Sequence, residues 1–144
     1  MARQTLPDSV EKRNLLHAGK ASPGTLLQLG KAFEAARRLP DALDFFAKAG
    51  DAEGVARIKA VAIETGNSFL LVRARRVGPV EVARDEWLAA AAAAERAGRW
   101  LDAYWCAKES GDEEKIAALE EKMRSTGGPS GNGSTGTAPG KSPL

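Results

Sequence analysis

Apolar residues recur along this chain every three or four positions, in short segments separated by glycine, proline and helix-capping residues. Leu26, Leu29 and Phe33 show this spacing, which places apolar side chains on one face of a helix. Proline fits the first turn of a helix, and glycine ends one in a left-handed conformation. The pattern predicts helices over residues 8–17, 22–36, 40–50, 51–66, 68–78, 79–98, 100–110 and 113–124. No segment alternates as a strand does, so the chain is predicted to be all-α.

Two stretches of the chain repeat each other without a gap. RRLPDALDFFAKAGDAEGVARI, which begins at Arg37, aligns residue by residue with GRWLDAYWCAKESGDEEKIAAL, which begins at Gly98. A fixed period of supersecondary units is typical of stacked helical repeats, whose usual work is to hold other molecules. The identical pairs are Arg38/Arg99, Asp41/Asp102, Ala42/Ala103, Gly50/Gly111, Asp51/Asp112, Glu53/Glu114 and Ala56/Ala117.

Residues 23–56 carry a spaced set of apolar and small residues: Leu26, Leu29-Gly30 and Phe33, then Ala42, Phe46 and Ala49. With this spacing they resemble a tetratricopeptide repeat. In that family a helix-turn-helix unit of about 34 residues carries large apolar residues, a Leu-Gly pair and an aromatic in its first helix, then Ala, an aromatic and Ala in its second. A second unit, 84–117, keeps Trp87 and Ala103, and residues 57–83 have the length of a degenerate intervening unit.

The resemblance implies a short right-handed α-solenoid of antiparallel helix pairs, built from residues 1–124. It also implies a non-catalytic scaffold that binds a peptide or protein on the concave side, which the first helix of each pair lines. The chaperone-binding members of the family clamp the terminal carboxylate of a peptide with lysine, asparagine and arginine side chains. The corresponding concave surface of this chain includes Leu27, Glu34 and Asp85 instead, so a peptide held by its terminal carboxylate is not the expected ligand. The resemblance places six residues on that surface: Leu27, Lys31, Glu34, Asp85, Leu88 and Arg96.

The three tryptophans are candidates for a binding surface, because tryptophan is enriched where partners dock. Trp87 lies on the apolar stripe of its predicted helix, and Trp105 lies where the repeat pattern expects burial, so both are predicted to be in the core. Trp100 follows the Gly98-Arg99 turn. It is therefore the predicted exposed or interface aromatic.

Composition distinguishes the end of the chain. Residues 125–144 are almost entirely Gly, Ser, Thr, Pro and Asn, and a segment that buries so little is predicted to be disordered. The single cysteine, Cys106, lies in the apolar and aromatic sequence AYWCAK and is predicted to be a buried thiol. No signal-peptide pattern or apolar run long enough to span a bilayer is present, so a cytoplasmic location without membrane insertion is expected.

The distribution of charged residues supports an alternative function to peptide binding. The net charge of +2 gives the whole chain no field that would recruit nucleic acid. A local cluster of Arg73, Arg75, Arg76 and Arg84, offset by Glu81, provides candidate phosphate-binding residues. The alternative functions are therefore a nucleic-acid-associated helical protein and a structural end piece of a larger assembly. The oligomeric state is not set by the sequence.

Catalytic chemistry has little support in the sequence. The only histidine, His17, has no nearby cysteine or second histidine with which to form a zinc site or a nucleophilic pair. Acidic pairs such as Asp41 and Asp44 could in principle perform acid-base chemistry. Their positions at helix starts and on polar faces, where the helix dipole and solvent favour carboxylates, explain them without a catalytic role. No glycine-rich phosphate loop is present. The chain is predicted not to be an enzyme and to use neither a cofactor nor a metal.

Overall fold

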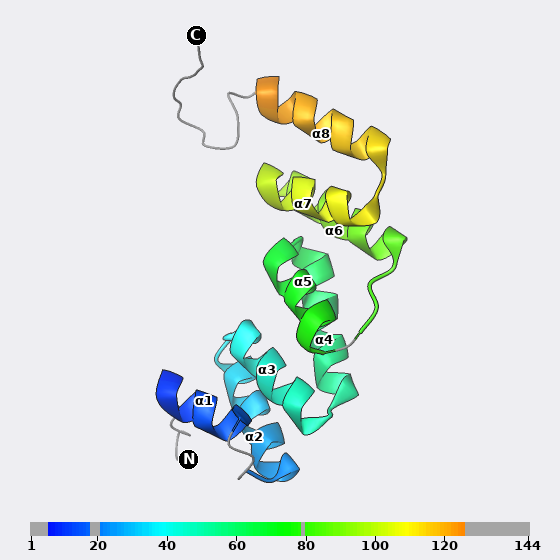
Figure 1. The fold of residues 1–144 in the computed structure, drawn as a ribbon. Helices are drawn as coiled ribbons and strands as arrows, with labels where there is room; N and C mark the ends of the chain where they lie inside the picture. Colours follow the sequence, from blue (N-terminus) through cyan, green and yellow to red (C-terminus); the bar gives the residue numbers. More distant parts are fainter. Residues whose placement is uncertain (1–5, 18–20, 79, 126–144) are drawn as a thin grey trace. The chain divides into compact units, whose positions relative to one another are not determined.

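The computed structural model describes residues 6–17, 21–78 and 80–125, and within them it is all-α, with eight helices and no strand (Figure 1). This confirms the predicted class. The predicted disordered segment lies outside the described residues apart from Ser125, the last residue of α8. The helices are α1 (Ser9–His17), α2 (Pro23–Ala35), α3 (Leu39–Ala49), α4 (Ala52–Thr65), α5 (Ser68–Val77), α6 (Arg84–Arg96), α7 (Trp100–Ser110) and α8 (Glu113–Ser125).

The described residues form two compact units. Of these residues, the first unit holds those up to Ala62 and those between Phe69 and Val82, and the second holds Ile63–Ser68 and those from Ala83 to Ser125. In the first unit α2 packs against α3, and in the second α6 packs against α7 and α7 against α8. Packing between neighbouring helices of this kind is compatible with a helical repeat.

The repeat of the sequence recurs in the backbone. α2, α3 and α4 begin at residues 23, 39 and 52, and α6, α7 and α8 begin with the same spacing at 84, 100 and 113. The turn between the first two helices of each set has the same conformation: Arg37 has φ 62° and Gly98 has φ 74°. After it, the Arg38 N–H donates to the Phe33 carbonyl and the Arg99 N–H to the Ala94 carbonyl, each at 2.9 Å. The two sets are therefore copies in local geometry as well as in sequence.

The core of the first unit is built around the Phe46 ring. A Cβ atom added to Gly30 of α2 would lie 2.8 Å from the ring, and one added to Gly54 of α4 would lie 2.5 Å from it. The Arg57 guanidinium lies 5.4 Å from the ring centroid. Phe46 therefore fills a space that two glycines leave open, and its side chain is fully buried.

The second unit fills the equivalent space differently. Positions 30 and 46 correspond to Ala91 and Ala107, so two alanines replace a glycine and a phenylalanine. The core here contains Ala94, Ala103, Ala107 and Leu119, and Trp100, Tyr104 and Ile116 pack against it as partly buried side chains. The Lys122 ammonium lies 5.2 Å from the centre of the Trp100 ring. Trp100 is therefore not exposed as predicted but partly buried, because its ring packs against this core of three alanines and Leu119, and its part in binding a partner stays a prediction.

Trp105 is the exposed tryptophan instead, with 51% of its surface accessible, while Trp87 is buried as predicted. The buried stripe of α7 runs through Ala103, Cys106 and Ala107. Trp105 is two positions from Ala103, a rotation of about 200° around the helix, and so points away from the core. The prediction that Trp105 is buried is therefore wrong, because its position around α7, not its aromatic character, determines that it faces solvent.

The predicted helix over 79–98 begins later than expected, at Arg84. Residues 80–83 are not helical. The Lys59 ammonium donates to the Glu81 carbonyl at 2.9 Å, and the Glu86 carboxylate accepts the Ala83 N–H at 2.9 Å. The Lys59 contact holds residues 80–83 outside the helix, and the Glu86 contact caps the first turn of α6.

Cys106 is a fully buried free thiol, as predicted. Burial, assisted by the Asp102 carboxylate, raises the pKa of the thiol to about 12. We expect a disulfide reagent at pH 8 to label the folded protein far more slowly than the unfolded chain, because the thiolate is the reactive form. Because the folded pKa lies above the ordinary value of 9.0, this thiol's stabilising contribution is complete below pH 9 and is lost as the pH rises toward 12.

Candidate interaction surfaces

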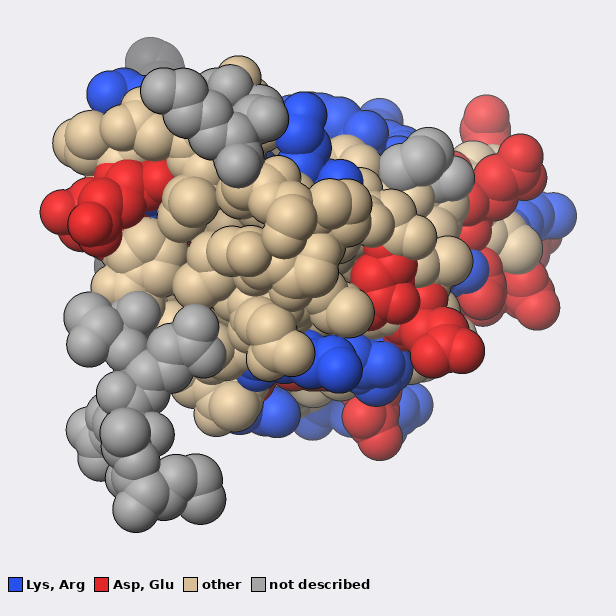
Figure 2. Space-filling view, turned by 90° about the horizontal axis from the view of Figure 1, so that it is seen from below, with Lys and Arg blue, Asp and Glu red and all other residues tan. Residues whose placement is uncertain are grey.

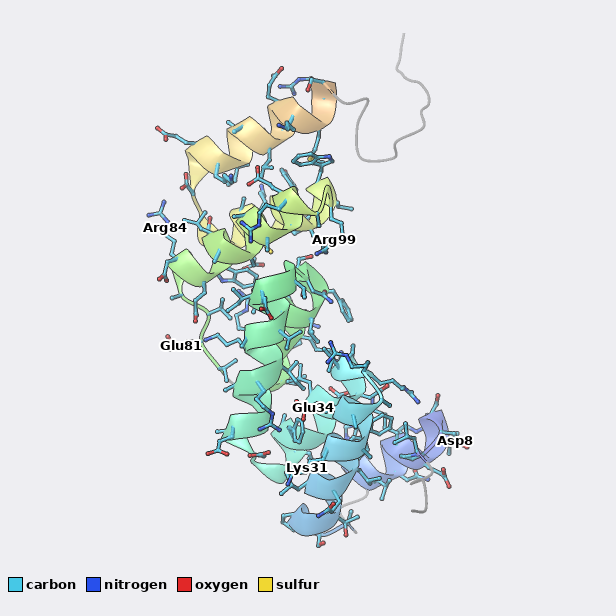
Figure 3. The ribbon with its side chains drawn as sticks, turned by 180° about the vertical axis from the view of Figure 1, so that it is seen from behind. Asp8, Lys31, Glu34, Glu81, Arg84 and Arg99 are labelled. Carbon is cyan, nitrogen blue, oxygen red and sulfur yellow. The ribbon has the colours of Figure 1, made fainter. Side chains whose placement is uncertain are left out.

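The predicted surface of the first unit lies along α2. Leu27, Lys31 and Glu34 are spaced four and three residues apart and so share one face of this helix, on which Figure 3 labels Lys31 and Glu34. Lys31 is exposed and Leu27 is half-buried. The Glu34 carboxylate is occupied, because it accepts from Arg57 Nε at 3.1 Å and from Nη2 at 3.0 Å. Glu34 therefore ties α2 to α4, and Lys31 is the accessible charge of this face.

The residues predicted in the second unit lie on α6. Leu88 occupies the position equivalent to Leu27 and is likewise half-buried, whereas Asp85 and Arg96 are exposed. Glu95, at the position equivalent to Glu34, forms an ion pair with Lys115 of α8. Both copies of the repeat thus carry an apolar residue on the first helix and a carboxylate that ties this helix to the third.

The predicted arginine cluster is divided between the two units. Arg73, Arg75 and Arg76 belong to α5 in the first, and Arg84 begins α6 in the second, where it lies 3.6 Å from the Asp112 carboxylate. Arg75 and Arg76 are exposed at the last turn of α5. Arg73 donates two hydrogen bonds of 2.8 Å from Nη2 to the carboxylate of Asp44. Its charge is therefore already compensated.

Asp44 is the centre of an ion-pair network that sequence reasoning missed. Its side chain is only 9% exposed, and Lys12 of α1 donates to it at 2.8 Å while also donating to Asp41 at 2.6 Å. Burial acts to lower the pKa of Lys12, but the hydrogen bonds to Asp41 and Asp44 outweigh it and the pKa is raised. Burial acts to raise the pKa of Asp41, but the Lys12 hydrogen bond and charge outweigh it and the pKa is lowered. Asp44 thereby joins α1, α3 and α5.

Neither a metal centre nor a membrane span is found in the described part of the chain. No group of three or more His, Cys, Asp or Glu side chains there could hold a metal ion. None of the helices described is long and apolar enough to cross a membrane.

The structure thus defines, for its described residues, an all-α protein of eight helices in which the local geometry of α2 to α4 recurs in α6 to α8. No family model matches the chain, and no curated protein or solved structure matches it either.

Proposed function

We propose that the protein is a non-catalytic interaction module of the tetratricopeptide type, a short solenoid that binds a peptide or protein. The observation that carries the proposal is the agreement between the sequence period and the backbone, with matching turns at Arg37 and Gly98. Stacked repeats of this kind bury their cores between neighbours and leave the first helices of each pair available for binding. A cytoplasmic location belongs to the same proposal and is supported by the single, buried, unpaired Cys106.

The side chains of α2 and α6 indicate the chemistry of the ligand. Lys31, Asp85 and Arg96 are exposed charges of both signs, and Leu27 and Leu88 add partly accessible apolar surface. We therefore propose a ligand that combines apolar anchors with charges of both signs, rather than a polyanion. Polar contacts then set the orientation, and apolar contacts contribute most of the affinity.

A peptide-display selection tests this proposal. Peptides selected on the wild-type protein should bind the double variant Lys31→Glu with Leu88→Asp at least about tenfold more weakly by fluorescence anisotropy, because charge and apolar surface are both lost. Arg75→Gln with Arg76→Gln is the matched control, since it removes two exposed charges of α5 and leaves the Arg73 ion pair intact. This control should bind as the wild type does. Circular dichroism checks that both variants remain folded.

The nucleic-acid alternative predicts the opposite pattern. If Arg75 and Arg76 bind phosphate, a labelled single-stranded oligonucleotide should bind the wild-type protein and dissociate steeply as salt increases. The arginine control variant should then lose binding while the Lys31→Glu and Leu88→Asp double variant keeps it. That result would remove the scaffold proposal.

A further inference from the structure

A cavity lies between α1, α3 and α5 of the first unit, beside the ion-pair network of Asp44. Its volume of about 300 Å³ is at the lower end of the range for pockets that hold ligands. Each of the three helices lines it with one apolar side chain: Leu16 of α1, Ala47 of α3 and Val77 of α5. We call this the α1–α3–α5 cavity. Its size and lining suit one apolar side chain of a partner rather than a whole helix.

The charged side chains that line this cavity are mostly basic. They are His17, Lys48 and Arg73, with the carboxylate of Asp44 as the single acidic group. That carboxylate is only 9% exposed, and its two oxygens already accept from Arg73 and Lys12. His17 and Lys48 are exposed, and neither is paired with a carboxylate of the described chain. Both are therefore available to an anionic ligand.

A second cavity continues the basic surface along α1. Its volume is about 320 Å³, and it shares four lining residues with the first. It adds Arg13, which is exposed and has no acidic partner among the residues described. The two carboxylates that it also adds are occupied, since Asp41 accepts from Lys12 and Asp8 from the Glu11 N–H. The added basic charge is therefore not cancelled by these carboxylates.

The net charge of +2 does not exclude such a local positive surface. Figure 2 shows lysine and arginine side chains in groups rather than evenly mixed with acidic ones. The repeat does not require the positive charge, because Lys48 corresponds to Glu109 in the second copy. The basic character of the α1–α3–α5 cavity therefore belongs to the first unit, and we interpret it as a feature of recognition.

We propose that the α1–α3–α5 cavity binds an acidic peptide segment that carries one apolar side chain. The apolar side chain enters among Leu16, Ala47 and Val77, where it leaves water. The carboxylates on either side of it form charge-assisted hydrogen bonds with Lys48 and Arg13. This site uses none of the residues proposed on α2 and α6, so it is a second binding surface and the two proposals can fail separately.

The lining of the cavity favours a peptide over a nucleic acid. Single-stranded nucleic acids stack their bases on aromatic side chains, and no Phe, Tyr or Trp is among the described residues that line this cavity. The walls are aliphatic instead, which suits a leucine-like side chain. Basic groups at the edge then select carboxylates on the same segment.

Isothermal titration calorimetry with a defined peptide tests the proposal. The probe is the acetylated and amidated peptide Glu-Asp-Leu-Asp-Glu, which should bind the wild-type protein. Replacing its leucine with serine, or its acidic residues with their amides, should each weaken binding at least about tenfold, because each change removes one of the two contributions. The double variant Lys31→Glu with Leu88→Asp should bind the probe as the wild type does, which separates this site from the surface of α2 and α6.

Two substitutions in the protein test the two parts of the site. Lys48→Glu should bind the probe about tenfold more weakly, because an attraction becomes a repulsion. Lys31→Glu is its matched control, since it makes the same change of charge at an exposed position of α2 and should leave binding unchanged. Ala47→Leu fills the cavity without a change of charge, so this variant should no longer distinguish the leucine peptide from the serine peptide. Circular dichroism checks that each variant is folded.

The proposal is overturned if the wild-type protein does not bind the probe at millimolar concentration. Equal losses for Lys48→Glu and Lys31→Glu would overturn it too, because they would show an unspecific attraction between charges. A preference for leucine that persists in Ala47→Leu would place the apolar contact elsewhere. If a short oligothymidylate binds more tightly than the peptide, and Lys48→Glu abolishes that binding, the site belongs to a nucleic acid instead.

Discussion

Replacing Phe46 with alanine should lower the free energy of unfolding by about 3–5 kcal/mol. The ring is fully buried and lies between the backbones of α2 and α4, which approach it closely only because positions 30 and 54 are glycine. Removing it leaves a cavity bordered by the main chain of Gly30 and Gly54, which have no side chains with which to fill it. The Arg57 guanidinium also loses the ring face over which it lies. Urea denaturation followed by circular dichroism measures the loss.

Phe69→Ala is the control for this experiment, since it removes the same side chain from a position that is 63% exposed. It should change the free energy of unfolding by less than about 1 kcal/mol. A similarly small loss for Phe46→Ala would show that the ring is not the core contact that the structure describes.

Gly66→Ala should cost roughly 3 kcal/mol of stability, for two reasons that add. Gly66 has φ 70°, a conformation that costs an alanine about 1–2 kcal/mol. The new methyl group would also lie 2.5 Å from the Ala94 nitrogen and 2.8 Å from the Ala90 carbonyl oxygen, both of them backbone atoms of α6. Overpacking of this kind adds about 1–3 kcal/mol, because the helix has to move to relieve it.

Two other glycines separate these contributions. Gly50 and Gly111 have φ 74° and 76°, and an added Cβ would meet nothing within 4 Å at either position. Gly50→Ala and Gly111→Ala should therefore show only the conformational cost, about 1–2 kcal/mol, in the same denaturation experiment. Equal losses at all three positions would contradict the close approach of the end of α4 to α6.

Helix positions and the repeat were predictable from sequence because both depend on local chemistry. Proline, glycine and capping residues act within one turn, and an amphipathic stripe needs only the helical period. The alignment of Arg37 with Gly98 therefore gave the equivalence of α2, α3 and α4 with α6, α7 and α8. The late start of α6 was missed because Lys59, far from Glu81 in the sequence, holds the preceding segment outside the helix.

The candidate surface was predicted less completely than the fold. Sequence reasoning put Lys31 and Glu34 on one helix face, but only the structure shows that Arg57 occupies the Glu34 carboxylate. It grouped Arg73 with its neighbouring arginines, whereas Arg73 binds Asp44. In both cases the deciding partner belongs to a different helix that is distant in the sequence, and no local pattern identifies it.

The sequence by itself determined that the chain is helical, where most of its helices lie, and that two parts of it share one local design. Only the tertiary structure decided which side chains remain exposed. Trp100 and Trp105 have the same chemistry and lie on the same helix, yet Trp100 packs against a core of three alanines and Leu119 while Trp105 is open to solvent. The reason is that burial depends on which helix packs against a given face, and that is set by contacts between distant residues rather than by the residues of the face itself.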